Sequence, residues 1–325
     1  MLAIKDKQYV VISPCRDEEE YLEHTLHSVI NQTLPPALWI IVDDGSSDRT
    51  PEILARYAEK YEFIRVHRRD NRGYRNVGPG VVDAFYAGLE LIDLDQFNFL
   101  CKLDLDLELP SRYFETLLTK MAADPRLGCA SGKPYNLRDG ALVSERRGDE
   151  MSVGMTKFYR TQCFREIGGI VREVMWDAID CHRARMLGWK ARSWDEPDLR
   201  FIHLRIMGSS QQGILTGKMR HGYGQYYMGT GFLYLSATAI FRVLDYPAFA
   251  GSLAVLWGYL RSWVAGRPRI NDREFIRYLR AFQHTALIQG KRRAIDQFEA
   301  AGRERWQSTR GPEDPQPSTG AAANA

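Results

Sequence analysis

Cysteine is scarce in this chain of 325 residues, and the five cysteines, an odd number, include no C-x-x-C pair. Their scatter argues against both a disulfide framework and a cysteine-rich zinc site, and it favours a reducing cytosol. The net charge is only +3, so the overall charge gives no argument for nucleic-acid binding. Residues 1–9 lack the apolar segment of a secretion signal, so we expect a cytoplasmic protein.

Long apolar runs are also missing, because no run reaches the ~20 residues that cross a bilayer. Residues 226–241 and 248–260 form two shorter runs rich in Tyr, Phe, Trp and Leu, separated by a segment with Arg242 and Asp245. They are either core-packing helices or helices that lie in a membrane interface. The basic residues over 261–293 favour anionic headgroups. We expect a helical region over 222–305 with peripheral membrane contact, and a disordered tail over 306–325.

Short apolar segments alternate with amphipathic ones through the first 131 residues. The pattern predicts strands at 9–12, 39–42, 63–67, 97–103 and 127–131, with helices at 17–32, 50–61, 81–91 and 111–123. A polar, exposed loop is expected over 138–150. This alternation predicts an α/β fold with a doubly wound, Rossmann-like, mostly parallel sheet, followed by the C-terminal helical region. In such sheets ligands bind beyond the carboxyl ends of the strands.

Acidic side chains follow two of these predicted strands. Asp43 and Asp44 come after the second strand, and Asp104 and Asp106 come after the strand at 97–103. Alternate residues of an extended chain point to the same side, so Asp104 and Asp106 can face one ligand. Carboxylates of this kind suit Mg²⁺ or Mn²⁺, ions that keep places for substrate phosphates. The alternative is an acid-rich surface turn.

Three segments in this order, Pro14-Cys15-Arg16-Asp17-Glu18-Glu19, Val42-Asp43-Asp44-Gly45-Ser46-Ser47-Asp48 and Asp104-Leu105-Asp106, together resemble family 2 glycosyltransferases of the GT-A fold. That family usually reads P-x-x-N-E-E in the first segment, so Asp17 stands where Asn is usual. The resemblance covers about residues 8–205, and a GT-A domain is expected at 1–221. It implies Mn²⁺ or Mg²⁺ and inverting transfer of a sugar from a UDP- or dTDP-linked donor. The expected acceptor is a hydroxyl of a lipid-linked or polysaccharide glycan, at the inner face of the cell membrane.

The resemblance also implies roles on the donor side of the site. Asp44 matches the acid that accepts a hydrogen bond from the base, Asp106 the direct metal ligand, and Asp104 the acid near ribose and metal. His203 is expected to complete the metal site, with a plain hydrogen-bonded histidine as the alternative. The other expected donor contacts are Pro14, Arg16, Glu18, Arg75, Arg205, Lys218 and Arg220. Arg75 is either a ligand or a solvated surface residue.

The segment Met175-Trp176-Asp177-Ala178-Ile179-Asp180 resembles the acceptor-side acid motif of the family. An inverting transferase needs a carboxylate that takes the proton of the acceptor hydroxyl. Asp177 is the preferred base and Asp180 the second candidate, because the spacing departs from D-x-D by one residue. The alternative for Asp180 is an acid at a helix start. Trp176 either stacks on a sugar or packs in the core.

Two other function classes compete with this interpretation. A nucleotidyltransferase usually carries a Gly-rich signature after its first strand, where this chain has Pro14-Cys15-Arg16-Asp17. A non-catalytic sugar-nucleotide binding module is the other alternative, and Asp177 beside an intact Asp104–Asp106 pair argues against it. The Gln-x-x-Arg-Trp motif of processive synthases is absent, which argues against a cellulose- or chitin-type polymerase.

Overall fold

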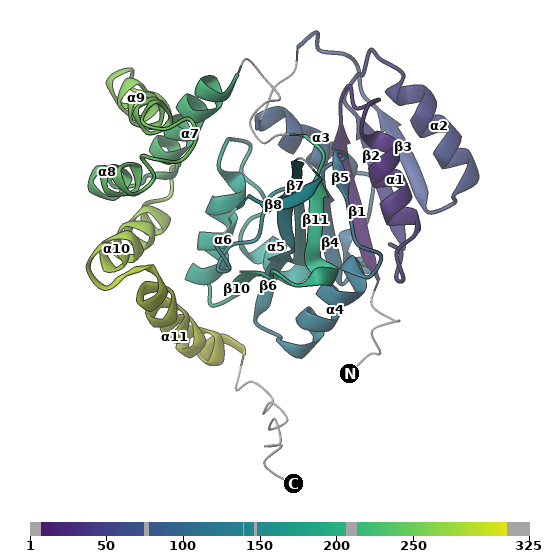
Figure 1. Ribbon diagram of the computed structural model, residues 1–325. Coiled ribbons are helices and arrows are strands. Elements are labelled where there is room, and N and C mark those ends of the chain that lie inside the picture. The colour runs from purple at the N-terminus through teal and green to yellow at the C-terminus, as the bar shows by residue number, and fades with distance from the viewer. Residues whose placement is uncertain (1–7, 75–77, 139, 146–147, 206–212, 311–325) are drawn as a thin grey trace.

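The computed structural model describes residues 8–74, 78–138, 140–145, 148–205 and 213–310. Its centre is a seven-stranded sheet with the order β10-β6-β9-β4-β1-β2-β3 (Figure 1). The strands are β1 Tyr9–Cys15, β2 Leu38–Asp43, β3 Ile64–Arg68, β4 Phe99–Leu103, β6 Leu127–Ser131, β9 Thr156–Arg160 and β10 Lys190–Ser193. Within this sheet β9 runs antiparallel to both of its neighbours, and the remaining pairs are parallel. The predicted mostly parallel α/β sheet is therefore confirmed.

Helices cover both faces of the sheet, as the alternation predicts. One face packs against α1 Leu22–Ile30, α2 Thr50–Lys60 and α4 Tyr113–Ala123, and the other against α3 Pro79–Leu89, α5 Thr161–Glu166 and α6 Trp176–Met186. Successive strand residues point to opposite faces. Phe158 of β9 accordingly packs in the first layer with Phe99 and Phe114, whereas Tyr159 packs in the second with Phe164 and Trp176. The two layers together form the core.

A second, four-stranded sheet has the order β5-β11-β7-β8. Its strands are β5 Leu107–Glu108, β7 Lys133–Arg138, β8 Ala141–Ser144 and β11 Arg200–His203. The polar loop expected over 138–150 is corrected here, because β8 pairs antiparallel with β7 inside that segment. β11 pairs antiparallel with β5, which sets His203 opposite Leu107, one residue beyond Asp106. This small sheet therefore joins segments that are far apart in the sequence.

The C-terminal helices lie in a row along one side of the sheet domain (Figure 1). They are α7 Ile214–Met228, α8 Phe232–Phe241, α9 Ala250–Val264, α10 Arg273–Gln289 and α11 Lys291–Arg310. Two expected boundaries change. The boundary at 221/222 falls inside α7, and the tail expected from 306 begins inside α11. Across the described ranges, we find no helix with the length and apolar character that a membrane span requires.

The helical row is packed onto the sheet domain at several points. Ile179 of α6 shares an apolar cluster with Met228 and Phe275. Further along, the ring of Trp306 in α11 meets the ring of Trp189 edge to face at 4.4 Å between centroids. These contacts fix α6, which carries Asp177 and Asp180, between the sheet and the C-terminal helices.

Candidate active site

The turn after β1 holds a residue in the left-handed backbone region. Asp17 has a φ of 51°, and its Oδ1 accepts a hydrogen bond of 2.8 Å from the N–H of Ser47. Its own N–H donates to Oγ of Ser46 at 2.9 Å. Asn and Asp are the side chains that best tolerate this conformation, since their short polar group bonds locally. Asp17 therefore meets the backbone requirement at the position where the family usually has Asn.

Asp44 lies at the carboxyl end of β2, beside β1. Its N–H donates to the carbonyl of Cys15 at 2.8 Å, which continues the pairing of Pro14 with Val42. The preceding acid, Asp43, accepts a hydrogen bond of 2.8 Å from the N–H of Ser46 and so holds the turn. The two adjacent carboxylates thus have different partners.

Three arginines surround Asp44. Arg69 donates to its Oδ1 at 3.0 Å, Arg72 donates to its Oδ2, and Arg16 donates to its main-chain oxygen at 2.5 Å. Burial raises the pKa of Asp44, and the arginines act in the opposite direction. Arg69 was not identified from the sequence, where it reads as one more charge in a basic segment. The three guanidinium groups therefore surround the buried Asp44 with hydrogen-bond donors.

Asp106 lies beyond β4, next to His203 of β11. Their Oδ2 and Nε2 atoms are 3.6 Å apart, and the other ring nitrogen of His203 is 2.8 Å from Oε1 of Glu145. Burial lowers the pKa of His203, but Asp106 and Glu145 outweigh it and raise the value to about 9. For Asp106, burial acts to raise the pKa, and His203 and Arg205 outweigh it and lower it. A carboxylate behind a histidine is the usual orienting partner of a metal-binding imidazole.

Arg205 connects this pair to the first segment of the chain. Its guanidinium forms an ion pair with Glu18 at 2.5 Å and lies 3.8 Å from Oδ2 of Asp106. The N–H of Glu18 donates to Oγ1 of Thr50 at 2.9 Å, so α2 fixes the acid that holds the arginine. The structure therefore brings together Glu18, Asp106, His203 and Arg205, the first and last of which are 187 positions apart in the sequence.

Asp104 is held by a lysine of β4, the strand that ends just before it. Nζ of Lys102 donates to Oδ1 of Asp104 and also to the carbonyl of Gly154 at 3.1 Å. Burial raises the pKa of Asp104, and Lys102 counteracts this effect. Each of the two carboxylates therefore has its own cationic neighbours, Lys102 for Asp104, and His203 and Arg205 for Asp106.

Asp177 stands in the first turn of α6, directly beside this group. A Cβ atom placed on Gly154 would lie 3.2 Å from Cβ of Asp177, so the carbonyl partner of Lys102 is also a neighbour of Asp177. The residue before the helix, Met175, has a φ of 64°. Such backbone strain in a residue with a long side chain is typical of functional sites. Asp177 is partly exposed, so it is accessible from solvent.

Trp176 has a different environment. It is buried, and Nζ of Lys102 and Nζ of Lys157 lie 5.3 and 5.7 Å from its ring. A ring between two ammonium groups gains cation–π energy. This arrangement matches the packing alternative for Trp176 and leaves little of the ring for stacking on a sugar.

Asp180 points away from solvent. It is buried, with Lys157 donating to its Oδ1 and Tyr159 donating to its Oδ2. Burial lowers the pKa of Lys157, but Asp180 reverses that effect and raises it. The helix-start alternative for Asp180 is corrected, since the residue lies in the body of α6 and forms an internal ion pair. Lys157 was not identified from the sequence, although a lysine next to the aromatic residues Phe158 and Tyr159 in a strand is a signal for a buried partner.

Three expected donor contacts lie elsewhere or outside the described residues. Arg75 falls in the segment 75–77, outside the described ranges. Lys218 and Arg220 lie on α7, and the side chain of Lys218 packs near Gly251 of α9. The C-terminal helices, and not the sheet edge, therefore position these two cations.

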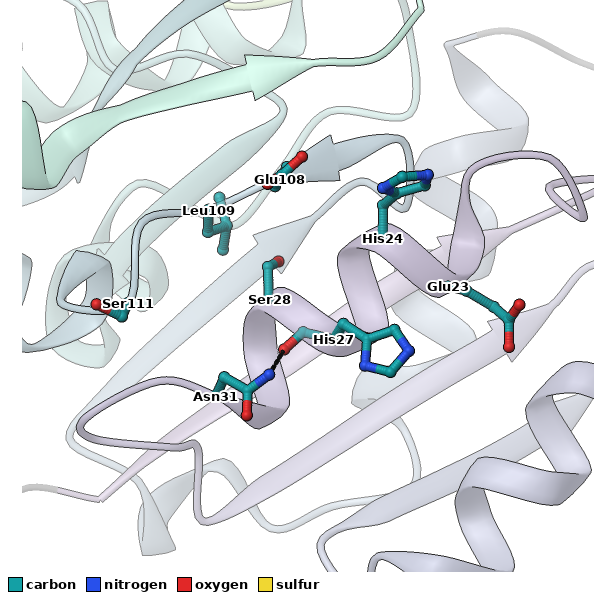
Figure 2. Close-up of a pocket in the computed structure, with 8 residues that line it drawn as sticks. All are labelled: Glu23, His24, His27, Ser28, Asn31, Glu108, Leu109 and Ser111. Atoms are coloured by element: carbon teal, nitrogen blue, oxygen red, sulfur yellow. Dashed lines mark hydrogen bonds between the residues drawn. The ribbon is translucent and has the colours of Figure 1, made fainter.

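A shallow groove of about 430 Å³ runs along the outside of α1 (Figure 2). It is lined by Glu23, His24, His27, Ser28, Asn31, Glu108, Leu109 and Ser111, none of which the sequence assigns to the donor or acceptor. In Figure 2 the side chains of His24 and His27 lie apart on the helix surface. None of the acids at the carboxyl ends of β2 and β4 lines the groove.

Asp106 and His203 can supply part of the coordination shell of a divalent cation. No group of three His, Cys, Asp or Glu side chains in the described part of the chain converges closely enough to hold a metal unaided. Asp106 and His203 offer one oxygen and one nitrogen next to each other, with Glu145 behind the imidazole. Mg²⁺ and Mn²⁺ sites commonly use one or two protein ligands and fill the remaining positions with substrate phosphates and water. The Asp106–His203 pair suits such an ion.

Solved structures with the same architecture define the class. A mannosyltransferase from Pyrobaculum calidifontis, PcManGT, in complex with GDP-Man and Mn²⁺, aligns with a TM-score of 0.50 and 16% identity over 95% of this chain and 89% of its own. GalNAc-T7 with UDP, GalNAc and Mn²⁺ aligns with a TM-score of 0.54 and 15% identity over 86% of this chain and 57% of its own. The fold is therefore that of the GT-A glycosyltransferases.

The sequence comparison gives the family. Residues 10–173, about half of the chain, match the model of glycosyl transferase family 2, and the chain belongs to this family. Among curated proteins it is similar to the poly-beta-1,6-N-acetyl-D-glucosamine synthases of Staphylococcus aureus (strain COL) and Staphylococcus epidermidis, each 31% identical over 121 residues. The match covers 37% of this chain and 27% of each relative's length. Membership of this family argues against the two competing classes, a nucleotidyltransferase and a non-catalytic binding module.

Proposed function

We propose that this glycosyltransferase transfers a sugar from a UDP- or dTDP-linked donor, with inversion, to a hydroxyl of a lipid-linked or polysaccharide acceptor. The reaction depends on Mn²⁺ or Mg²⁺ and takes place at the inner face of the cell membrane. Support for the donor class comes from two neighbours in the family and fold. The curated relatives are named as N-acetylglucosamine polymer synthases, and GalNAc-T7 carries UDP.

One observation supports the proposal above the others. Asp104, two residues before Asp106, is connected to the candidate base Asp177 through Lys102 and Gly154. A transferase needs a site for the donor diphosphate and a base for the acceptor close enough to act on one anomeric carbon. This path of contacts supports a donor site and a base on neighbouring elements.

On the donor side, the nucleotide occupies the ends of β1 and β2. Asp44 and its arginines Arg16 and Arg72 contact the base, and Asp104 faces the ribose. A divalent ion held by Asp106 and His203 would offset the negative charge of the diphosphate. Arg205, which lies between Glu18 and Asp106, adds a further positive charge near the leaving group.

On the acceptor side, Asp177 takes the proton of the acceptor hydroxyl as that oxygen attacks the anomeric carbon. A new C–O bond forms on one face of the sugar while the bond to the diphosphate oxygen breaks on the other. The configuration at the anomeric carbon therefore inverts, and the nucleoside diphosphate leaves with the electron pair. Asp180 takes no direct part, because its ion pair with Lys157 is buried behind α6.

The test is turnover of a panel of nucleotide sugars with and without Mn²⁺, using membrane glycolipid and soluble glycan acceptors. We expect the largest rate with a UDP- or dTDP-sugar, a loss of transfer in EDTA, and a product whose anomeric configuration is opposite to that of the donor by NMR. A retained configuration, or a rate that EDTA leaves unchanged, would contradict the mechanism.

A further inference from the structure

The helix α9 has two faces of very different character. Its inner face packs on α7 with the two backbones in close contact, since a Cβ on Gly258 would lie 2.1 Å from the carbonyl of Met219. Its outer face carries Leu253, Trp257 and Val264, which are 65%, 58% and 79% exposed. Residues at these spacings lie on one stripe of a helix. The outer stripe of α9 is therefore apolar and open to solvent.

The helix α8 and the turn that follows continue this surface. The hydroxyl of Ser252 in α9 donates to the carbonyl of Ala239 in α8 at 2.9 Å, which joins the two helices. Leu235 and Ala239 are buried, while Ile240 and Phe241 on the outside are 73% and 89% exposed. In Figure 1, α8 and α9 form the margin of the molecule that is farthest from β1–β3.

We define the hairpin patch as the exposed large apolar side chains of residues 232–264. These 33 positions hold eleven of the twenty exposed large hydrophobic side chains of the described chain, so the exposure is concentrated in one place. The members are Phe232, Leu233, Ile240, Phe241, Leu244, Tyr246, Phe249, Leu253, Trp257, Trp263 and Val264. Contiguous apolar surface on this scale marks an interaction site.

The charges around the hairpin patch indicate what it contacts. Residues 232–293 contain ten Lys or Arg and three Asp or Glu. Arg242 directly follows Phe241 and forms an ion pair with Asp245, and Arg261 comes one helical turn after Trp257 on the same stripe of α9. Both arginines are exposed next to the apolar side chains. Trp and Tyr beside Leu and Phe, bordered by arginine, are typical of surfaces that meet lipid headgroups.

The dimensions decide between spanning the membrane and lying on it. α9 has 15 residues and α8 has 10, and both are too short to cross the hydrocarbon core. Helices with one apolar face and a basic border lie in the plane of the interface instead. The excess of basic over acidic residues across 232–293 favours an anionic bilayer over a protein partner.

We propose that the hairpin patch docks on the surface of an anionic phospholipid bilayer, with Trp257 and Phe241 in the acyl boundary and Arg242 and Arg261 at the phosphates. This docking adds a membrane surface to the proposed function. It rests on that function only in so far as the acceptor is a membrane glycolipid. Lipid binding needs neither donor nor acceptor, so it can fail or succeed independently of transfer.

The docked helices are tied to the acceptor side of the site. α7, which supports α9, packs on the segment before α6: the hydroxyl of Tyr223 donates to Glu173 at 2.8 Å, and a Cβ on Gly224 would lie 2.3 Å from the side chain of Met175. Met175 stands two residues before Asp177. Docking would therefore hold the candidate base at a set position relative to the lipid surface, where the head of a glycolipid projects.

The first test is flotation of the intact protein with vesicles of phosphatidylcholine, alone or mixed with phosphatidylglycerol. We expect flotation with the mixed vesicles at low salt, and at least about a tenfold weaker affinity for Leu253→Glu/Trp257→Glu. The matched control is Leu91→Glu/Leu142→Glu, which places two charges at exposed apolar positions outside the hairpin and should float like the wild type. Arg242→Glu/Arg261→Glu should lose the preference for the anionic vesicles.

A second measurement does not depend on destabilising variants. Brominated lipids should quench the tryptophan fluorescence of the wild type, and Trp257→Phe should remove part of that quenching. Failure of the intact protein to float at low salt overturns the proposal, and so does equal flotation of the Leu253→Glu/Trp257→Glu variant. A stable dimer by light scattering that Leu253→Glu/Trp257→Glu dissociates, with no vesicle binding, would assign the patch to a second copy of the chain instead.

Discussion

The ammonium group of Lys157 donates a hydrogen bond to the main-chain oxygen of Asp177 and another to the carboxylate of Asp180. One cation in β9 thereby holds two successive turns of α6. Asp177 keeps its side chain near solvent while its backbone is fixed from inside the protein. The two acids of the motif therefore differ in environment. Asp177 is accessible from solvent, whereas Asp180 is buried and anchors α6 to β9.

Asp177→Asn should remove most of the transfer rate and leave donor binding nearly unchanged. The amide keeps the size of the side chain but cannot take the hydroxyl proton, and loss of a general base typically lowers kcat by about 10²–10⁴-fold. The loss should appear in kcat more than in the donor KM, since the proton moves only in the transition state. Steady-state kinetics with a varied donor measures both, and an active Asp177→Asn enzyme would exclude Asp177 as the base.

Asp180→Asn should act on stability. Removing one partner of a buried ion pair leaves Lys157 uncompensated, which typically costs about 3–5 kcal/mol. Thermal unfolding followed by circular dichroism should show a clear drop in Tm. The double variant Lys157→Met/Asp180→Leu should recover part of it, because both charges are gone. An Asp180→Asn protein with wild-type Tm and no activity would reverse the roles assigned to the two acids.

Glu145→Gln should weaken the affinity for Mn²⁺ without removing a direct ligand. Glu145 lies behind His203, and loss of such a partner typically costs about 10- to 100-fold in metal affinity. Asp106→Ala should be more severe. Titration of Mn²⁺ followed by electron paramagnetic resonance, in the presence of nucleoside diphosphate, gives both values. Glu108→Gln, an exposed acid of β5, is the control and should bind Mn²⁺ like the wild type.

Asp17→Asn should be tolerated, whereas Asp17→Val should be destabilising. Asn can adopt the φ of 51° and accept the same hydrogen bond from Ser47. A β-branched side chain in the left-handed region costs about 1–2 kcal/mol or more and also loses that bond. Comparison of the two Tm values tests this, and equal values would show that the turn accepts any side chain.

Much of the fold follows from local sequence patterns. The alternation of short apolar strands with amphipathic helices predicts the parallel sheet, and strand ends carry Asp44, Asp104 and Asp106 as expected. The strands, the helices and the acids at the strand ends can be predicted because they depend on the spacing of apolar residues and on turn residues within short segments. The structure then shows that α1 begins at Leu22, so the acids from Asp17 to Glu20 lie in the turn before the helix.

The remainder depends on contacts between distant segments. Glu145 is one acid in a polar stretch, and the pairing of β8 with β7 and of β7 with β11 brings it to His203. Asp180 has the spacing of a helix-start acid, and its burial depends on Lys157, which lies 23 positions earlier. The boundary at 221/222 follows a change of composition, but α7 continues through it because Gly222 and Gly258 let two helices touch.

The alternating faces of β9 make this strand sensitive to changes in length. Lys157 and Tyr159 point toward α6, and Phe158 points into the opposite layer beside Phe99 and Phe114. Deletion or insertion of one residue between Gly154 and Thr156 would exchange the two sets, since a shift by one position turns every side chain of a strand over. The ammonium would enter an aromatic layer, and α6 would lose its anchor. The segment from Gly154 to Thr156 should therefore tolerate a substitution better than a change in length.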